Sequence, residues 1–319
     1  MDRRDFLTQV GTGLAGVAAW SRGVFGQTTP DVELELRAST SALPVLTGPP
    51  SRVWRYEATL LKGPADSVQP VSGSYLGPTL RFQKGWRVRI HFINNLPEPS
   101  IVHWHGLDVP TDADGHPRLA VASGRRYVYE FEVVNRAGTY WYHPHPHMRT
   151  AHQVYQGLAG LIVVTDAEEA ALKLPTGPHE LFCVIQDRQF DGQNQLVYLD
   201  GMRMEAMNGF LGDRVLVNGR PPMPLSLATR PYRLRLMNGS NSRVYKLAWE
   251  PPMPMTVIGT DGGLLETAVQ RRYLTLAPGE RVDTILDLSA VAVGTRLTMR
   301  SVAFPSHLDS IQLGMGRGR

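Results

Sequence analysis

Hydrophobic and polar residues alternate along much of the chain, and this pattern predicts β-strands. Val32–Ala38 reads Val-Glu-Leu-Glu-Leu-Arg-Ala, and Trp86–Phe92 places Val88 and Ile90 on one face with two arginines on the other. Successive side chains of a strand point to opposite faces, so this period of two is typical of a strand with one buried face. Gly157–Thr165 is instead a continuous apolar run, which predicts a strand buried on both faces.

Turn-forming segments separate the predicted strands at intervals of about ten residues, which is typical of a β-sandwich or barrel. One short helix is predicted at Asp166–Lys173, and Leu174–Pro178 reads as a linker. The other strands predicted before the linker are Val53–Leu61, Thr79–Phe82, Ile101–Leu107, Tyr127–Val133 and Gly138–Tyr142. Those predicted after it are Glu180–Asp187, Arg214–Val217, Tyr232–Asn238, Val244–Trp249, Met255–Ile258, Tyr273–Leu276, Arg281–Asp287 and Arg296–Ser301.

Length and composition agree with a turn-rich all-β protein. The chain has 319 residues, with 31 Gly and 24 Pro, and its length fits two domains of about 130 to 150 residues after a short leader. The net charge of +4 comes from scattered basic residues, which argues against nucleic-acid or membrane binding. Cys183 is the one cysteine, so a disulfide within the chain is excluded.

The N-terminus has the pattern of a twin-arginine export signal. Arg3 and Arg4 precede Asp5-Phe6-Leu7, and a weakly apolar stretch follows over residues 10–20. That stretch is too short to span a bilayer. We therefore predict a signal peptide over residues 1–27 and a periplasmic or other extracytoplasmic location. A disordered charged leader is the alternative.

Two histidine pairs, His103 with His105 and His143 with His145, are the main candidate chemistry. Alternate residues of a strand face the same way, so each pair places two imidazoles on one face about 7 Å apart. Four imidazoles that converge predict a transition-metal site for copper, zinc, iron or nickel. Surface or structural histidines without a metal are the alternative.

The order and spacing of several motifs resemble one known family, the multicopper oxidases. The matching stretches before the linker are Gly77-Pro78-Thr79-Leu80-Arg81, His103-Trp104-His105-Gly106-Leu107, Gly138 through His145, and Gln153-x-x-x-Gly157-Leu158-x-Gly160. Those after it are Gly212-Asp213 with Val215 through Gly219, Arg233 through Asn238, and Ala277-Pro278-Gly279-Glu280-Arg281-x-Asp283. The resemblance implies two cupredoxin-like Greek-key β-sandwich domains in tandem, over residues 28–173 and 179–305, with a linker at 174–178 and a tail at 306–319.

The same resemblance implies roles for the histidines at a trinuclear copper cluster that reduces O2. His103 would bind the type 2 copper, and His105, His143 and His145 would bind the type 3 pair, so the chain would carry half of the cluster's ligands. The second nitrogen of each ring should meet a backbone carbonyl or a carboxylate. Asp114 stands where the family often has an acid that assists proton delivery to oxygen. A solvated loop carboxylate is the alternative, and Asp108 and Asp112 are weaker candidates.

Other residues are less specific. His147 and His152 extend the histidine-rich run and are expected outside the set of direct ligands. A methionine cluster, Met202, Met204 and Met207, suits Cu(I) chemically but is more often packing. Cys183 lies in an apolar strand and is expected to be a buried core thiol. Four further histidines have no motif around them: His91, His116, His179 and His307.

Two motifs of the family's enzymes are absent from this sequence, the His-Cys-His segment of the type 1 copper and the His-x-x-His-x-His segment. The resemblance then implies a multicopper oxidase that stops after its second domain. We expect an enzyme, or part of one, that oxidises a phenol or a metal ion with O2. The alternatives are an exported copper-binding protein without catalysis, and a scaffold similar to the multicopper-oxidase-like cell-division proteins. The histidine face should be exposed and apolar around Trp104 and Trp141, and it could recruit a partner chain or a third domain.

Overall fold

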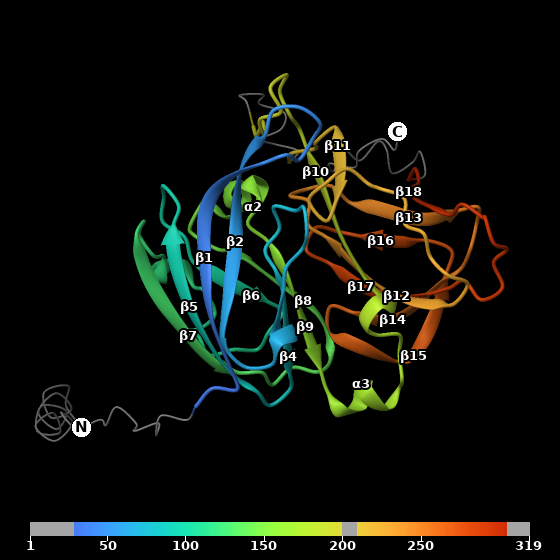
Figure 1. The fold of residues 1–319 in the computed structure, drawn as a ribbon, viewed down its shortest axis with the longest axis horizontal. Coiled ribbons are helices and arrows are strands. Elements are labelled where there is room, and N and C mark those ends of the chain that lie inside the picture. Colours follow the sequence, from blue (N-terminus) through green and yellow to red (C-terminus); the bar gives the residue numbers. More distant parts are fainter. Residues whose placement is uncertain (1–28, 200–208, 305–319) are drawn as a thin grey trace, which may run out of the picture. The chain divides into compact units, whose positions relative to one another are not determined.

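The computed structural model describes residues 29–199 and 209–304 (Figure 1). The predicted signal peptide, the methionine cluster, His307 and the predicted tail lie outside the described residues. From Asp31 onward the described residues belong to one compact unit. Among them, no helix has the length and apolar character needed to cross a membrane.

The strands before the linker form two sheets, called here the N-terminal part. One sheet has the order β2-β1-β5-β7, and the other has the order β3-β4-β9-β8-β6. The first comprises β1 (Val32–Leu43), β2 (Ser51–Lys62), β5 (Arg87–Asn95) and β7 (Arg125–Glu132). The second comprises β3 (Val68–Gln69), β4 (Thr79–Gln83), β6 (Val102–His105), β8 (Gly138–Pro144) and β9 (Gly160–Thr165). Within them β1 and β5 are parallel, as are β4 and β9.

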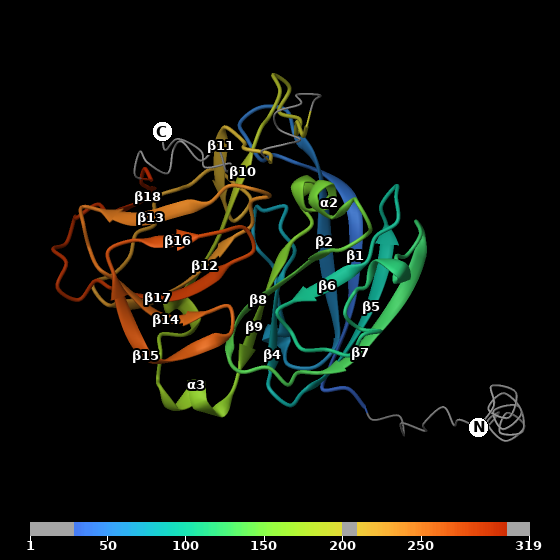
Figure 2. The same cartoon turned by 180° about the vertical axis from the view of Figure 1, so that it is seen from behind.

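The strands after the linker form two more sheets, called here the C-terminal part, and Figure 2 shows both groups from behind. The six-stranded sheet has the order β11-β10-β12-β17-β14-β15, and the three-stranded sheet the order β16-β13-β18. The first comprises β10 (Glu180–Arg188), β11 (Arg214–Val217), β12 (Pro231–Asn238), β14 (Met255–Thr260), β15 (Gly263–Arg271) and β17 (Arg281–Asp287). The second comprises β13 (Tyr245–Glu250), β16 (Leu274–Leu276) and β18 (Thr298–Ser301). The predicted all-β fold is confirmed.

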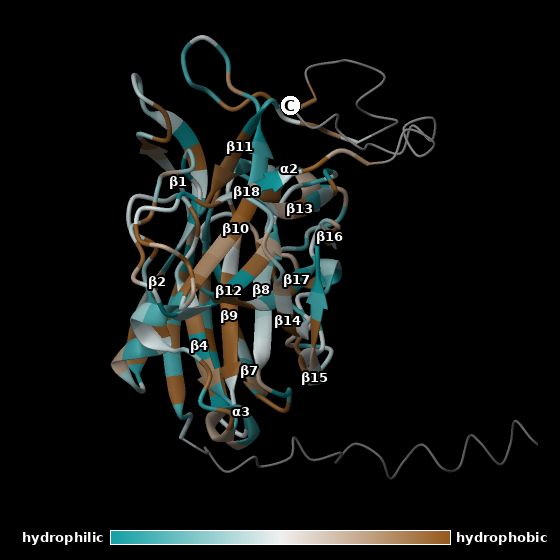
Figure 3. Ribbon diagram, turned by 90° about the vertical axis from the view of Figure 1, so that its right-hand side faces the viewer, coloured by the Kyte–Doolittle hydropathy of each residue, from teal (hydrophilic) through white to brown (hydrophobic). Residues whose placement is uncertain are grey.

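Strand β9 shows why the continuous apolar run was informative. It lies between β4 and β8 in the middle of its sheet, and its residues from Gly160 to Val164 are buried. Figure 3 shows β9 in the brown of hydrophobic residues. Gly160 leaves room for the Tyr142 ring, because a Cβ at this glycine would lie 2.2 Å from the Tyr142 Cζ. Close packing of β9 on β8 therefore depends on that glycine.

The helices are short. Helix α3 (Ala167–Ala171) begins after Asp166, whose carboxylate accepts a hydrogen bond from the Glu169 backbone N–H at 2.8 Å. It falls within the predicted helix. Helix α2 (Thr150–Gln156) was not predicted, because its short sequence has no strong apolar period and its buried face includes a glutamine. Three single-turn 3₁₀ helices are η1 (Ala65–Ser67), η2 (Pro117–Leu119) and η3 (Gly177–His179).

Strand β15 was also missed, for a different reason. It is the edge strand of the six-stranded sheet, and Glu266, Thr267, Ala268 and several other of its residues are exposed. An edge strand with this composition lacks the apolar alternation by which buried strands are recognised. The sequence pattern therefore reports burial more directly than it reports backbone conformation.

A buried ionic network joins the two parts. Arg235 donates to the carboxylates of Glu180 and Asp283 at 2.7 and 2.8 Å and to the Thr139 hydroxyl at 2.8 Å. The Thr139 hydroxyl in turn donates to Asp283 at 2.5 Å. Because Thr139 lies on β8 and the charged residues lie on β10, β12 and β17, these bonds tie the histidine-bearing strand to the C-terminal part.

Arg233 extends the network to helix α3. Its guanidinium donates to Glu169 at 2.5 Å and to Asp283 at 2.7 Å, and the side chains of all three are at most 9% exposed. Charges this deeply buried require partners, because each loses most of its hydration. The network supplies those partners from both parts of the chain.

Glu180 gives the network a predicted dependence on pH. Burial alone would raise the pKa of this carboxyl, but Arg235 and Arg81 outweigh burial and hold the pKa below its ordinary value of 4.5. The ionised carboxylate therefore stabilises the fold above pH 4.5, and this stabilisation is lost as the pH falls through the folded-state pKa. In urea unfolding from about pH 7 to about pH 3, the free energy of unfolding should fall less steeply for Glu180→Gln than for the wild type. Equal slopes for the two proteins would contradict this assignment.

Candidate metal centre

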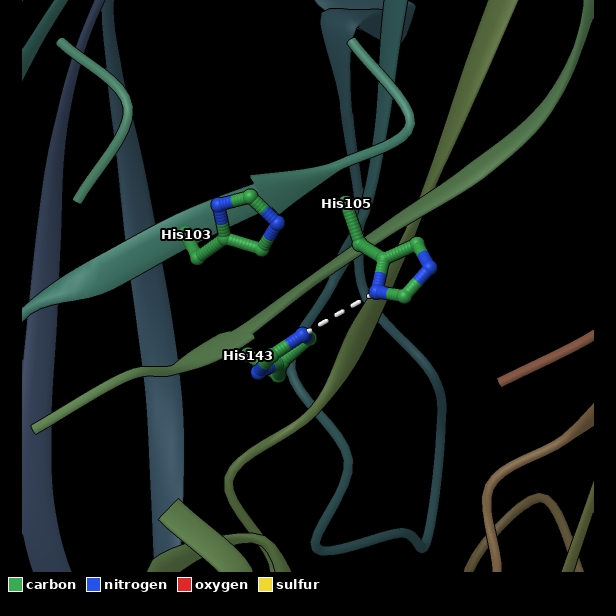
Figure 4. A group of neighbouring side chains, drawn as sticks. All are labelled: His103, His105 and His143. Atoms are coloured by element: carbon green, nitrogen blue, oxygen red, sulfur yellow. Dashed lines mark hydrogen bonds between the residues drawn. The ribbon is translucent and has the colours of Figure 1, made fainter. Parts of the chain in front are cut away.

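Strands β6 and β8 bring the two histidine pairs together by antiparallel pairing. His103 stands directly opposite His143 in the register, and His105 stands opposite Trp141. Side chains that face each other across an antiparallel pair have Cβ atoms about 5 Å apart. The two sequence motifs therefore meet because their strands are hydrogen-bonded neighbours, as Figure 4 shows for three of the rings.

Three of the four histidines form a tight group. One ring nitrogen from each of His103, His105 and His143 lies within 4.8 Å of the others, a spacing that could hold a metal ion. The shortest approach, 3.2 Å, joins His105 Nδ1 to His143 Nε2 and therefore runs between the pairs (Figure 4). Within the first pair the ring centroids are 5.7 Å apart, closer than the separation of about 7 Å expected from strand geometry.

His145 lies next to this group. Its ring centroid is 5.3 Å from that of His103 and 6.1 Å from that of His143. Its ring nitrogens are not part of the three-histidine set that lies within 4.8 Å. The structure thus brings all four predicted histidines into one neighbourhood and places three of them at metal-ligand spacing.

Two of the rings are oriented by hydrogen bonds to backbone carbonyls. His103 Nδ1 donates to the Asp114 carbonyl at 2.8 Å, and His143 Nδ1 donates to the Pro144 carbonyl at 2.8 Å. A protonated Nδ1 leaves the Nε2 lone pair of each ring free for a metal. The expectation that second nitrogens meet carbonyls is confirmed for these two. His105 differs, because its Nδ1 faces His143 Nε2.

Burial keeps these imidazoles neutral. It lowers the pKa of His143 well below the ordinary value, and burial together with nearby Arg281 lowers the pKa of His105 to about 4. Burial and then the neighbouring His103 lower the pKa of His145 as well. Metal ligation needs the unprotonated ring, so these three rings are in the ligand form at neutral pH.

Asp114 lies beside the histidine group. Its carboxylate Oδ1 is 3.1 Å from His103 Nδ1, and its side chain is 47% exposed. It therefore connects the group to solvent. Asp108 and Asp112 contribute backbone atoms to hydrogen bonds with Asn135 and Tyr127, and no contact of their carboxylates with the histidines is found among the described residues.

The prediction of an exposed apolar surface around Trp104 and Trp141 is wrong. Trp104 is 0% exposed and Trp141 is 6% exposed. Trp104 alternates with His103 and His105 along β6, so it points to the opposite face, where it packs on Tyr129 at 5.0 Å and its Nε1 donates to the Ala113 carbonyl. An apolar exposed face recruiting a partner through these rings is therefore not present.

Trp141 is buried by neighbouring histidine rings and by a turn of the C-terminal part. Its ring lies 4.2 Å from the His143 ring and 5.0 Å from the His105 ring, and the turn between β16 and β17 covers its edge. A Cβ at Gly279 in that turn would lie 3.6 Å from both Trp141 Cζ2 and His105 Cε1. The sequence indicated this turn only through its resemblance to the family motif, and nothing in its composition placed it at the histidines.

The remaining candidates lie apart from the group. His152 packs edge-on against Trp54 at 5.5 Å, and burial lowers its pKa. Cys183 packs against the hydrophobic core of the C-terminal part although the residue as a whole is partly exposed, and burial raises the pKa of its thiol to about 11. His91 lies on β5, and its Nε2 is 2.7 Å from the Glu33 Oε1. Among the described residues, His147 does not belong to the set of side chains at metal-ligand spacing.

Comparisons with known proteins agree with this geometry. A family model described as multicopper oxidase matches residues 53–169. The chain is 39% identical over 218 residues to the multicopper oxidase mco of Staphylococcus haemolyticus, which covers 68% of this chain and 48% of that protein. It is 33% identical over 292 residues to the cell division protein FtsP of Escherichia coli, which covers 91% of this chain and 60% of that protein.

Solved structures show the same relationship. The McoA multicopper oxidase of Aquifex aeolicus superposes with a TM-score of 0.75 at 36% identity, over 88% of this chain and 59% of that one. The chain thus spans about half to three fifths of the length of the relatives described here. Family model, motifs, fold and relatives agree over the shared region, and the chain belongs to the multicopper oxidase family.

Proposed function

We propose that His103, His105, His143 and His145 bind copper and form the N-terminal half of a trinuclear centre in an exported oxidoreductase. The observation that carries the proposal is the set of three imidazole nitrogens within 4.8 Å of one another. Neutral imidazoles suit copper without adding negative charge, and two of the rings have their Nε2 atoms directed by carbonyl anchors. The donor set therefore fits the metal that the family implies.

Each residue has a defined part in this proposal. His103 would hold the type 2 copper, and the other three histidines would hold the type 3 pair. Copper at these positions would supply one-electron redox chemistry for the reduction of O2 to water, driven by one-electron oxidation of a phenolic or metal-ion substrate. Asp114, half exposed and next to His103, would take protons from solvent and pass them toward the site.

The same proposal includes the organisation of the chain. Residues 28–173 and 179–305 would be cupredoxin-like domains joined by residues 174–178, after a twin-arginine signal over residues 1–27. The grouping of β1–β9 and β10–β18 into separate sheets supports this division. The type 1 copper motif is absent from the sequence, so electron entry from substrate would need a further chain or segment at the histidine face.

Copper binding by the wild-type chain tests the proposal. After dialysis against Cu(II) and removal of loose metal, we expect copper to be retained at one to a few ions per chain, with an electron paramagnetic resonance spectrum of nitrogen ligation. Oxygen uptake with a phenol or Cu(I) should stay at the background rate for this chain alone. Retention of no copper would overturn the proposal, and rapid oxygen uptake would contradict the absence of an electron-entry site.

A non-catalytic role is the second candidate. The match to the cell division protein FtsP covers 91% of this chain, more than the match to the oxidase of Staphylococcus haemolyticus. A scaffold of that kind would not need the histidines as ligands. Copper retention that depends on the histidines would contradict such a scaffold, because the oxidase and a copper-binding protein without catalysis both predict it.

A further inference from the structure

The turn between β16 and β17 reaches the histidine group from the C-terminal part. Gly279 in this turn has a φ of +82°, a conformation that glycine adopts readily. The Glu280 carboxylate accepts a hydrogen bond from the Ala277 backbone N–H at 2.6 Å, and the Gly279 N–H donates to the Asn238 carbonyl at 2.8 Å. These hydrogen bonds hold the backbone of the turn in place next to the histidine rings.

Arg281, the residue that follows the turn, touches both histidine-bearing strands. Its side chain is 3% exposed, and its Nε donates to the Thr139 carbonyl on β8 at 3.0 Å. A Cβ at Gly106, the residue after His105, would lie 2.7 Å from Arg281 Nη2. Nη1 donates to the Gly279 carbonyl and pairs with the Asp261 carboxylate, and Nη2 donates to the Asp261 carbonyl. One rigid guanidinium thus links the turn to β8 and to the end of β6.

His105 is the histidine that needs such support. His103 and His143 each have a backbone carbonyl that orients the ring, but His105 has no such partner among the described residues, and its Nδ1 faces His143 Nε2. Its ring instead packs against Trp141, with the ring centroids 5.0 Å apart, and the glycine turn lies beyond its edge, where a Cβ at Gly279 would be 3.6 Å from His105 Cε1. Packing from Trp141 and from this turn therefore limits how far the ring can rotate.

We propose that Arg281 and Gly279 are positioning residues for His105, so that the C-terminal part completes the copper site through packing without donating a ligand. The predicted effect on copper affinity rests on the proposed function. The positioning of the His105 ring itself does not depend on a bound metal. Ligand rings held by surrounding groups bind metal more tightly, and loss of one such group typically costs about 10- to 100-fold in affinity.

The test compares Arg281→Met with Arg281→Lys and with the control Arg243→Met. Arg243 is a suitable control because it is also a mostly buried cation of the C-terminal part, bonded to Asp187 at 2.8 Å and to the Gly212 carbonyl. In metal-free protein, nuclear magnetic resonance of the imidazole nitrogens should show His105 signals shifted or broadened in Arg281→Met. The signals of His103 should stay in place, and Arg243→Met should match the wild type.

The Arg281→Met variant should bind Cu(II) about 10-fold more weakly than the wild type, and its Cu(II) electron paramagnetic resonance spectrum should differ. The Arg281→Lys variant should restore most of the affinity and most of the wild-type spectrum. If Arg281→Met fails to fold, Gly279→Asn replaces it, because asparagine tolerates positive φ and its side chain would press on His105 while the buried hydrogen bonds remain. Unchanged His105 signals in both Arg281→Met and Gly279→Asn would overturn the inference. Absence of copper from the wild type would overturn the proposed function instead, and the metal-free signals would still decide the positioning role.

Discussion

Replacing His103 and His143 together by alanine should lower the copper retained by the chain to background. The two rings stand opposite each other across β6 and β8 and carry the two carbonyl-anchored nitrogens of the group. His105 and His145 would remain, but among the described residues the His105 ring has no hydrogen bond to a backbone carbonyl. Loss of a single group that holds a ligand ring in place already lowers metal affinity by about 10- to 100-fold. We therefore expect removal of two ligands to lower the copper affinity by at least about 100-fold.

Equilibrium dialysis with Cu(II), followed by metal analysis, measures the effect. His91→Ala is the matched control, because His91 lies on β5 and contacts Glu33 at 2.7 Å, away from the group. Circular dichroism of each variant checks that the fold survives. Equal copper retention by the double variant and the His91 variant would show that these histidines are not the ligands and would favour a scaffold role.

Replacing Asp283 by asparagine should lower the free energy of unfolding by about 3 to 5 kcal/mol, the usual cost of removing one partner of a buried ion pair. Asp283 accepts hydrogen bonds from Arg233, Arg235 and Thr139. Burial alone would lower the pKa of Arg235, but Asp283 and two glutamates raise it above its ordinary value. Arg235 therefore stays charged, and the variant removes the carboxylate that the two buried guanidiniums share.

Urea unfolding of Asp283→Asn, compared with Glu168→Gln, measures this loss. Glu168 pairs with Arg136 at 3.2 Å, but the two side chains are 73% and 53% exposed. A solvent-exposed pair of this kind is worth about 0 to 1 kcal/mol. If the Asp283 variant lost no more stability than the Glu168 variant, the network would be a passive contact that does not hold the two parts together.

Much of the fold follows from the alternation of side chains. The period of two predicted most of the strands, and the apolar run ending at Thr165 predicted the central strand β9. The histidine pairs were also readable, because their sequence motifs fall in strands that then pair directly. What the sequence could not supply was which face of each strand meets which surface.

Arg233 and Arg235 show this limit most clearly. They alternate with Leu234 and Leu236 on β12, and a period of two with arginines on one face ordinarily indicates a solvent-facing side. That face is instead buried, at 0% and 1% exposure, because it packs toward β8 and helix α3. Alternation distinguishes two faces of a strand, but it does not tell a solvated face from one that meets oppositely charged residues of another sheet.

The same limit hid the contribution of Arg281 to the site. Its position in the sequence, directly after a turn, is unremarkable for an arginine. Its contact with Thr139 joins residues 142 positions apart, and local patterns carry no information at that separation. Trp104 is buried, contrary to expectation, because it alternates with His103 and His105 along β6 and so points into the opposite face of the sheet.

The network between β8, helix α3 and the C-terminal strands has a consequence for the order of events during synthesis. Asp283 follows its partner Thr139 by 144 residues, and Arg233 follows Glu169 by 64. Chains emerge from the ribosome N-terminus first, so the histidine strands are complete while these partners and the Gly279 turn are still unmade. Copper encountered at that stage would meet His105 without its support. If the histidines hold copper as proposed, we expect the metal to bind only after β17 has been made.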